Sequence, residues 1–297
     1  MYNKEEKMNK LELLRTALKA IESSSNEILT IYNKHIDVEI KGDGSPLTNA
    51  DKAANKEINR ILSSSNLPII SEEIKNDKFD IRKKWSKYWL VDPIDGTKGF
   101  IAKNDEFTIN IALVENNNPS IGIVYVPVSG ILYIGFNNNS YKAIKGIDFN
   151  NFDELINKLN DSLIGLNKIS VNLTPNFPIK IIGSRNHLNE ETEFFISKLK
   201  DYFDEVEILS VGSSLKICLV AEGKADIYPR LGLTNEWDIA AAHAVLKFAG
   251  GNLFIYDKDL PVSSYINRSE FPSNIEYNKE SLKNPYFIVS GLHKYNM

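Results

Sequence analysis

The stretch WLVDPIDGTKGF, residues 89–100, begins like a buried strand and ends with charged residues. Its apolar start indicates burial, yet Asp92 and Asp95 follow at once, with Gly96 and Thr97 directly after them. A turn accounts for one Asp and the Gly, because both residue types tolerate the backbone angles of turns. It does not account for two carboxylates beyond a buried strand. The pair therefore indicates a site rather than a simple turn.

The composition excludes several classes of protein. A net charge of −4 argues against a general nucleic-acid binder, which usually shows a basic face. The single Cys218 cannot form an internal disulfide and suits a reducing compartment. There is no apolar run of about 20 residues, and MYNKEEKMNK at the start lacks the apolar stretch of a secretory signal. We expect a soluble cytoplasmic protein, with a peripheral association at the inner face of the membrane left open.

The pattern of apolar residues changes along the chain. Helical spacing predicts a long helix over residues 9–32 and a second one starting near Thr48. Four β-rich segments separated by turn residues then predict an antiparallel meander over residues 107–144. From residue 179 onward, strand and helix patterns alternate. We expect an N-terminal α+β subdomain over residues 1–160, with most metal ligands, and a C-terminal α/β subdomain over residues 161–297, with Asp238 and the nucleotide contacts.

Further carboxylates stand at the ends of predicted elements, and each has an ordinary explanation. Asp51 follows Thr48 by three residues, which is the spacing of a helix-capping pair. Asp238 could cap the helix that follows it, and Glu72 with Glu73 could be a solvated pair in a loop. A cap or a solvated loop therefore explains each of these positions when it is considered alone.

Together the acids indicate a metal-assisted phosphoryl site. Mg²⁺ prefers hard oxygen ligands, so a few carboxylates and a substrate phosphate can complete its shell. Two such ions, about 4 Å apart, can hold both the attacking and the leaving oxygen. Gly96 and Thr97 would open a helix whose free N–H groups suit a phosphate. The D-P-I-D-G-T run is one residue longer than the D-x-D-G-T of haloacid-dehalogenase-type phosphatases, which excludes that class.

These motifs resemble the inositol monophosphatase superfamily of metal-dependent phosphatases. WLVDPIDGTKGF matches its first long motif and WDIAA at 237–241 its second, while SEE at 71–73 and the Thr48-to-Asp51 spacing match the shorter ones. Within the superfamily, SPLTNAD, EFTINIAL and GSSLKICLVAEGKADIYPR resemble the bacterial 3'(2'),5'-bisphosphate nucleotidases. One departure is Gly99, where that branch usually has Glu after Gly-Thr-Lys.

The resemblance implies a layered αβαβα sugar-phosphatase fold of two stacked subdomains, with the site between them. It also implies two or three Mg²⁺ ions, inhibition by Li⁺, and the following roles. The first metal would be held by Glu72, Asp92 and the carbonyl of Ile94, and the second by Asp92, Asp95 and Asp238. Asp51 with Thr97 would orient and deprotonate the attacking water, with Glu73 supporting the metal shell. The expected substrate contacts are Gly96, Thr97, His187, Ser213, Lys216, Arg230 and Asp238.

The expected substrate is a small molecule, adenosine 3',5'-bisphosphate, with 3'-phosphoadenylyl sulfate as a second one. Lys216 offers a mobile charge and Arg230 a planar phosphate binder, although either could be an ordinary surface residue. His187 could equally cap a helix or lie on the surface. Neither a nucleic acid nor a protein partner is required. Two alternatives stay open: an inositol or sugar monophosphatase with the same metals, and a non-catalytic binding protein.

Overall fold

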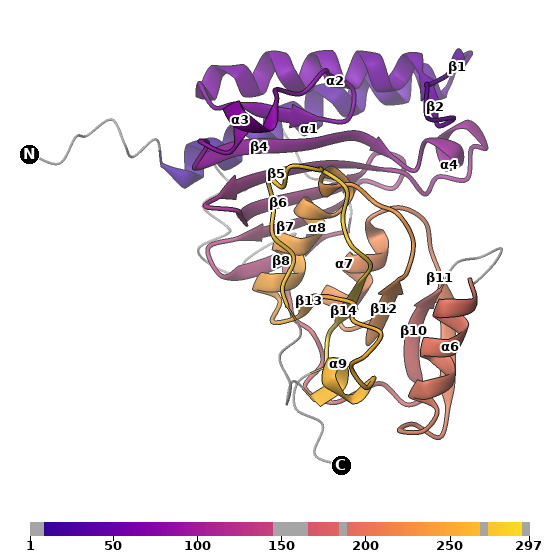
Figure 1. Cartoon of the computed structure of the whole chain (residues 1–297). Coiled ribbons are helices and arrows are strands. Elements are labelled where there is room, and N and C mark those ends of the chain that lie inside the picture. The colour runs from indigo at the N-terminus through magenta and orange to yellow at the C-terminus, as the bar shows by residue number, and fades with distance from the viewer. Residues whose placement is uncertain (1–8, 145–165, 184–188, 268–272, 293–297) are drawn as a thin grey trace, which may run out of the picture.

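The computed structural model describes residues 9–144, 166–183, 189–267 and 273–292. In this part of the chain, helices and sheets alternate in five layers (Figure 1). Two helices cover a seven-stranded sheet, two more lie between it and a five-stranded sheet, and short helices cover the far face of the second sheet. The expected αβαβα fold is confirmed.

The first helical layer packs on one face of the large sheet. Helix α1 (Lys10–Tyr32) and helix α2 (Asn49–Leu62) bury their apolar stripes in one core with that face, and a 3₁₀ turn, η1 (Ser63–Ser65), follows α2. A separate two-stranded hairpin, β1 (Val38–Ile40) with β2 (Pro46–Thr48), precedes α2.

The large sheet has the order β3-β4-β5-β6-β7-β8-β9, and only the β3–β4 pair is parallel. Its strands β5 to β8 form the expected antiparallel meander. The strands are β3 (Ile69–Ser71), β4 (Lys87–Asp95), β5 (Thr108–Glu115), β6 (Asn118–Val126), β7 (Ile131–Phe136), β8 (Asn139–Ala143) and β9 (Asn167–Ile169). The short helices α3 (Phe79–Arg82) and α4 (Thr97–Ile101) stand before and after β4.

Strand β4 aims its side chains alternately at the two helical layers. Trp89 and Val91 are buried with α1 and α2, whereas Tyr88 and Leu90 are buried with the central helices. Because successive side chains of a strand point to opposite faces, Asp92 continues the series that faces the central layer. Asp95 lies three residues further on and would face the other way in a regular strand.

A β-bulge turns Asp95 to the same face as Asp92. Asp92 pairs with Asn110 on β5 and Asp95 pairs with Thr108, so β4 carries one extra residue between the two pairs. A bulge of this kind reverses the alternation and bends the strand. Pro93 lies inside the bulge, where a missing N–H disturbs the ladder least. The bulge therefore explains how two acids three residues apart meet at one site.

Glycines let the central helix α8 (Glu236–Phe248) lie close to the large sheet. A Cβ at Gly122 of β6 would lie 2.1 Å from the carbonyl oxygen of Ala241, and a Cβ at Gly135 of β7 would lie 2.7 Å from backbone atoms of Ala244. Neither position can carry a side chain while the helix stays in place. The short helix α7 (Leu215–Ala221) packs beside α8 in the same core.

The second sheet has the order β11-β10-β12-β14-β13. Its strands are β10 (Ile179–Gly183), β11 (Val206–Ser210), β12 (Ile227–Arg230), β13 (Asn252–Ile255) and β14 (Phe287–Ser290). Helices α6 (Glu190–Leu199) and α9 (Ser263–Asn267) cover its outer face (Figure 1).

Some boundaries differ from the sequence-based expectation. Strand β4 continues through the acidic pair to Asp95, because the bulge keeps it paired with β5. Helix α8 begins at Glu236, so Asp238 lies in its first turn and Asn235 takes the capping position that was expected of Asp238. The subdomain boundary near residue 160 stays a prediction, because residues 145–165 lie outside the described residues.

Candidate active site

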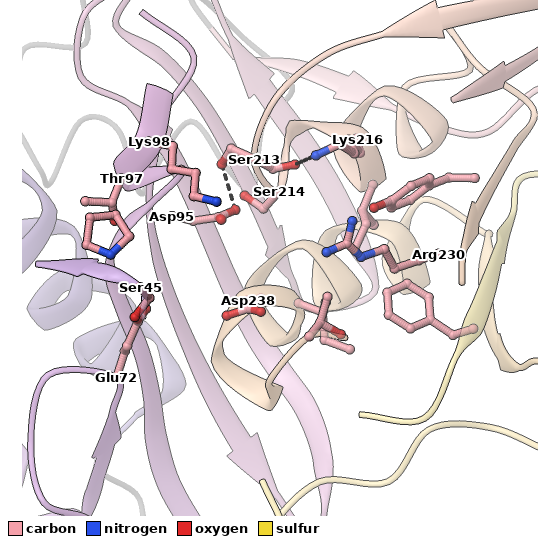
Figure 2. A pocket seen from close by; sticks show the side chains of 17 residues that line it. Ser45, Glu72, Asp95, Thr97, Lys98, Ser213, Ser214, Lys216, Arg230 and Asp238 are labelled. Carbon is pink, nitrogen blue, oxygen red and sulfur yellow. Dashed lines mark hydrogen bonds between the residues drawn. The ribbon is translucent and has the colours of Figure 1, made fainter. Parts of the chain in front are cut away.

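A cavity of about 410 Å³ opens where the large sheet, the β1–β2 hairpin and the central layer meet. Figure 2 shows Asp95 and Asp238 in its middle, with Thr97 and Lys98 on one side and Arg230 on the other. The lining includes most of the side chains expected at the site, among them Glu72, Asp95, Gly96, Thr97, Ser213, Lys216, Arg230 and Asp238. His187 lies outside the described residues.

Three carboxylates form a tight group at this cavity. Among the described residues, Glu72, Asp92 and Asp238 offer oxygens that all lie within 4.8 Å of one another. Burial raises the pKa of Asp92 well above its usual range, and the charges of Glu72 and Asp95 raise it further. Burial and the charge of Asp95 raise the pKa of Asp238 to about 8. Asp92 is buried, and Glu72 and Asp238 are partly buried. Like charges brought together in this way are stabilised by a cation, and hard oxygen donors suit a divalent one.

Asp95 and Ile94 stand at the edge of this carboxylate group. The Ser213 hydroxyl donates to Asp95 Oδ2 at 2.7 Å, which fixes one carboxylate oxygen and leaves the other available. The carbonyl of Ile94 accepts a hydrogen bond from the Thr97 hydroxyl at 3.2 Å, and the Ile94 amide donates to Asp92 Oδ1 at 3.1 Å. The backbone of Ile94, inside the bulge, thus contacts both the expected ligand Asp92 and the side chain of Thr97.

Asp51 lies in the first turn of α2, with Thr97 next to it. Its Oδ2 accepts from the Thr48 amide at 2.7 Å and from the Thr48 hydroxyl at 2.6 Å, which closes a capping box. Its Oδ1 lies 3.5 Å from the Thr97 hydroxyl, which is a long contact. Burial raises the pKa of Asp51, although the Thr48 hydrogen bonds oppose the shift. Asp51 is therefore both the expected cap and a carboxylate beside Thr97.

Lys41 is a site residue that sequence reasoning missed. It comes from the β1–β2 hairpin, and its Nζ lies 2.8 Å from Glu72 Oε1 and 2.5 Å from Glu73 Oε1. Burial opposes the charge on Lys41, but the hydrogen bonds to both acids outweigh it, so the pKa of Lys41 is raised. Lys41 lies in a polar, Gly-containing connection, and nothing in that local sequence predicts a role at the site. Its acidic partners are more than 30 residues away in the chain.

The cations on the opposite wall come from α7 and β12. Lys216 Nζ donates to the Ser213 carbonyl at 3.3 Å, and Arg230 Nη2 donates to the Leu233 carbonyl at 3.1 Å. Within the described residues, the buried Nε of Arg230 has no hydrogen-bond partner. A half-buried guanidinium with an unused donor can bind an anion. This wall can therefore hold a second negatively charged group, opposite the carboxylates.

Two glycines shape the turn between β4 and α4. Gly96 has a φ of +94°, a conformation that favours glycine, and a Cβ there would lie 3.1 Å from the carbonyl oxygen of Glu106. At Gly99 a Cβ would lie 2.7 Å from Asn104 Oδ1, so the Asn104 side chain occupies the space that a longer residue would need. Asn104 thus fills the space beside Gly99, the position at which the related nucleotidases usually have Glu.

Two side chains of α8 and α7 belong to the core of the central layer. His243 Nδ1 lies 2.8 Å from the Tyr277 hydroxyl. Cys218 is fully buried. None of the helices in the described residues is long and apolar enough to cross a membrane.

The layered fold and the acidic cavity together define a phosphatase of the metal-dependent class. The chain belongs to the Inositol monophosphatase family, which matches residues 9–283. It is 40% identical over 235 residues to the 3'(2'),5'-bisphosphate nucleotidase CysQ of Buchnera aphidicola, covering 78% of this chain and 80% of the relative. It is 35% identical over 272 residues to the CysQ of Escherichia coli, covering 90% and 95%.

Solved structures agree with this assignment. The crystal structure of CysQ from Bacteroides thetaiotaomicron, a bacterial member of the inositol monophosphatase family, superposes with a TM-score of 0.76 at 37% identity and covers 95% of this chain and 98% of that one. The extragenic suppressor protein suhB from Bartonella henselae superposes with a TM-score of 0.67 at 19% identity, covering 94% and 93%. At that identity the second likeness shows the fold alone.

Proposed function

We propose that this protein is a 3'(2'),5'-bisphosphate nucleotidase that removes the 3'-phosphate of adenosine 3',5'-bisphosphate and releases AMP and phosphate. The curated relatives with that name, at 35–40% identity over most of the chain, support the proposal. 3'-Phosphoadenylyl sulfate is proposed as a second substrate, because it carries the same 3'-phosphate. A small molecule is the only partner that the proposal needs.

The observation that carries the proposal is the distribution of charge across the cavity. The carboxylate group lies on one side, and Lys216 and Arg230 lie on the other. A monophosphatase needs only the acidic side, whereas a bisphosphate substrate has a second phosphate to bind. The unused Nε donor of Arg230 supports a contact with that second phosphate or the adjoining sugar. Ser213 and His187 are proposed to contribute further contacts.

The proposed cofactor is Mg²⁺, in two or three ions. Glu72, Asp92 and the Ile94 carbonyl would hold one ion, and Asp92 would share the second with Asp95 and Asp238. When bound, Mg²⁺ neutralises the negative charge that develops on the oxygens of the transferring phosphoryl group. We propose that Li⁺ inhibits by competing with one of these ions.

The proposed catalytic step depends on Thr97 and Asp51. The Thr97 hydroxyl orients the attacking water and accepts a proton from it. The hydroxyl gives its own proton to Asp51 Oδ1, which lies 3.5 Å away. Catalytic hydrogen bonds are often long before the substrate binds and tighten in the complex, so this distance is compatible with the role. The amides of Gly96 and Thr97 hold the scissile phosphate in line with the water. Glu73 supports Glu72 through their shared partner Lys41.

Two further expectations stay part of the proposal. We propose a division into an N-terminal subdomain with most metal ligands and a C-terminal one with the nucleotide contacts. We also propose a cytoplasmic enzyme, with membrane association at most peripheral.

The experiment is phosphate release from adenosine 3',5'-bisphosphate, inositol 1-phosphate and fructose 1,6-bisphosphate at saturating Mg²⁺. The proposal expects the highest kcat/KM for the adenosine bisphosphate. A preference for inositol 1-phosphate would make this chain an inositol monophosphatase instead. Turnover of none of the three substrates would favour a binding protein.

Arg230→Ala sharpens the same assay. Losing one charge-assisted contact costs about 1.5–3 kcal/mol, which is roughly 10- to 150-fold in kcat/KM for the adenosine bisphosphate. Inositol 1-phosphate, which lacks a second phosphate, should be scarcely affected. The matched control is Arg60→Ala, because Arg60 is an exposed cation on α2 that pairs with Glu57. Equal losses on both substrates would place Arg230 in the metal site or the fold.

A further inference from the structure

A cluster of buried polar side chains lies behind Asp95. Thr108 and Asn110 come from β5, and Ser213 and Ser214 come from the loop that leads into α7. Thr108, Asn110 and Ser214 are at most 4% exposed. The three hydroxyls and the amide touch one another, and the cluster ends on the Asp95 carboxylate.

Five close contacts hold this cluster together. Ser213 Oγ lies 2.7 Å from Asp95 Oδ2 and 2.5 Å from Thr108 Oγ1. Thr108 Oγ1 lies 2.9 Å from Ser214 Oγ. The Asn110 side chain completes the set with one amide atom, assigned as Oδ1, at 3.1 Å from Thr108 Oγ1 and 2.8 Å from Ser214 Oγ.

The number of protons does not fit that assignment of the amide. Each hydroxyl carries one proton, so three protons would have to serve five contacts. At the same time, the Asn110 Nδ2 is buried and has no partner within the described residues. An unpaired buried donor is costly, and here two N–H protons would be left without an acceptor.

Exchanging the nitrogen and oxygen of the Asn110 amide resolves the count. The two ends of an amide have nearly the same shape, so the hydrogen-bond network decides which is which. With Nδ2 in the inner position, its two protons go to Thr108 and Ser214. Ser214 then donates to Thr108, Thr108 to Ser213, and Ser213 to Asp95. Five protons serve five contacts, and every bond points toward the carboxylate.

We propose that Asn110, Thr108, Ser214 and Ser213 form a directed chain of hydrogen-bond donors that holds Asp95 in position to bind a metal ion. Thr108, Asn110 and Ser214 are then positioning residues of the site. The inference rests on the proposed metal role of Asp95, and it extends that role to residues on β5.

The architecture explains why the chain forms at this place. The bulge pairs Asp95 with Thr108 across β4 and β5, so both side chains face the central layer. On the other side, Ser213 has a φ of 56°, which is uncommon for a residue other than glycine. The amide of the preceding Gly212 donates to Glu106 Oε2 at 2.9 Å, which holds this loop against the segment just before β5.

The donor chain fixes the geometry of Asp95. A donor on Oδ2 fixes the rotation of the carboxylate and leaves Oδ1 as the free ligand atom. Because Ser213 lies two residues before α7, the helix that carries Lys216, the donor chain joins the carboxylate side of the cavity to its cationic wall.

The test is Mn²⁺ binding to the substrate-free protein, followed by the electron paramagnetic resonance of free Mn²⁺. Loss of a residue that orients a metal ligand typically weakens metal binding about 10- to 100-fold, which we expect for Thr108→Val. Thr108→Ser keeps the hydroxyl and should bind Mn²⁺ within about threefold of wild type. Asp95→Asn is the reference variant, which should lose at least as much affinity as Thr108→Val.

The outcomes separate this inference from the proposed function. Wild-type Mn²⁺ affinity in Thr108→Val, with a loss in Asp95→Asn, would overturn the donor chain and leave the metal site intact. Wild-type affinity in Asp95→Asn would overturn the metal role itself and the chain with it. Because Thr108→Val could fail to fold, a second measurement uses the wild-type protein. In nuclear magnetic resonance, the two Asn110 amide protons should show contacts to the side chains of Thr108 and Ser214, and absence of both contacts would overturn the chain.

Discussion

The N-termini of α2 and α8 are built alike. In α2, the Asp51 carboxylate accepts a hydrogen bond from the Thr48 amide at 2.7 Å. In α8, the Asp238 carboxylate accepts one from the Asn235 amide at 2.9 Å. Each acid is the third residue of its helix, and Oδ2 is the capping oxygen in both. The other oxygen is left for another contact.

The two acids differ in what that second oxygen meets. Asp51 Oδ1 faces the hydroxyl of Thr97, whereas Asp238 joins Glu72 and Asp92 in the carboxylate group. The local sequence therefore determines a capping carboxylate, and the neighbouring layer determines what that carboxylate can do. We infer that Asp51 handles a proton and that Asp238 binds a metal ion.

The largest expected effect follows from removing the charge of Asp51. Loss of acid–base help should lower kcat by about 10²- to 10⁴-fold in Asp51→Asn. The cap should survive, because the new amide oxygen can still accept from Thr48. Steady-state kinetics at saturating Mg²⁺ measures the change, and a kcat within about threefold of wild type would remove Asp51 from the proton transfer.

Thr97 should show a related but smaller effect. Thr97→Val deletes the hydroxyl with little change in shape, and we expect a loss of about 10²-fold in kcat. Thr97→Ser, the matched control, should keep much of the activity. Equal losses in the two variants would mean that the shape of the residue matters and its hydroxyl does not.

The metal-free protein should lose stability as the pH rises. The folded-state pKa of Asp92 is raised well above its usual range and that of Asp238 to about 8, while the unfolded value is about 3.9. The folded state therefore holds more protons, and this contribution is complete below the unfolded pKa and lost as the pH rises through about 8. Without metal, Asp238→Asn should melt at a higher temperature than wild type at pH 8.5, with no difference near pH 4.

Saturating Mg²⁺ should reverse that order at pH 8.5, because only the wild type keeps the full ligand set. His243 titrates in the opposite sense: burial lowers its pKa to about 3, so its contribution is lost as the pH falls below its unfolded value. Both proteins contain His243, so the difference between them cancels this effect. A melting temperature of Asp238→Asn that never exceeds the wild type would contradict the buried like-charge account.

The smallest effects belong to the caps themselves. Thr48→Ala and Asn235→Ala should each lower the free energy of unfolding by about 1 kcal/mol. Only Thr48→Ala should also lower kcat, because the Thr48 hydroxyl donates to Asp51 at 2.6 Å and helps to orient it. Chemical denaturation and kinetics measure the two properties separately. A similar fall in kcat for Asn235→Ala would show that the two caps are not specialised.

Much of this comparison was open to prediction from the sequence. Periodicity placed both helices and the antiparallel meander, and motif spacing singled out Asp51, Asp92, Asp95 and Asp238. The family resemblance predicted that these four acids lie at one site. It did not predict the β-bulge that brings Asp92 and Asp95 to the same face of β4. The bulge depends on the register between β4 and β5, which no local pattern in WLVDPIDGTKGF specifies.

Contacts between distant segments were beyond the sequence. Lys41 lies in a stretch that was expected only to separate two helices, yet it pairs with Glu72 and Glu73. Thr108 and Ser214 are 106 residues apart in the chain and meet because β5 and the loop before α7 face one another. A polar residue in a strand pattern indicates an exposed side chain or an unseen partner, and only the fold identifies that partner.

The most direct test titrates Mg²⁺ into wild type, Asp51→Asn and Asp238→Asn and follows the melting temperature of each. We predict that Asp51→Asn responds to Mg²⁺ with a midpoint within about threefold of wild type, because Asp51 lies outside the group formed by Glu72, Asp92 and Asp238. Asp238→Asn should need about tenfold more Mg²⁺ or should not respond at all. Equal midpoints in all three proteins, or a shift confined to Asp51→Asn, would contradict the division of roles between the two capping acids.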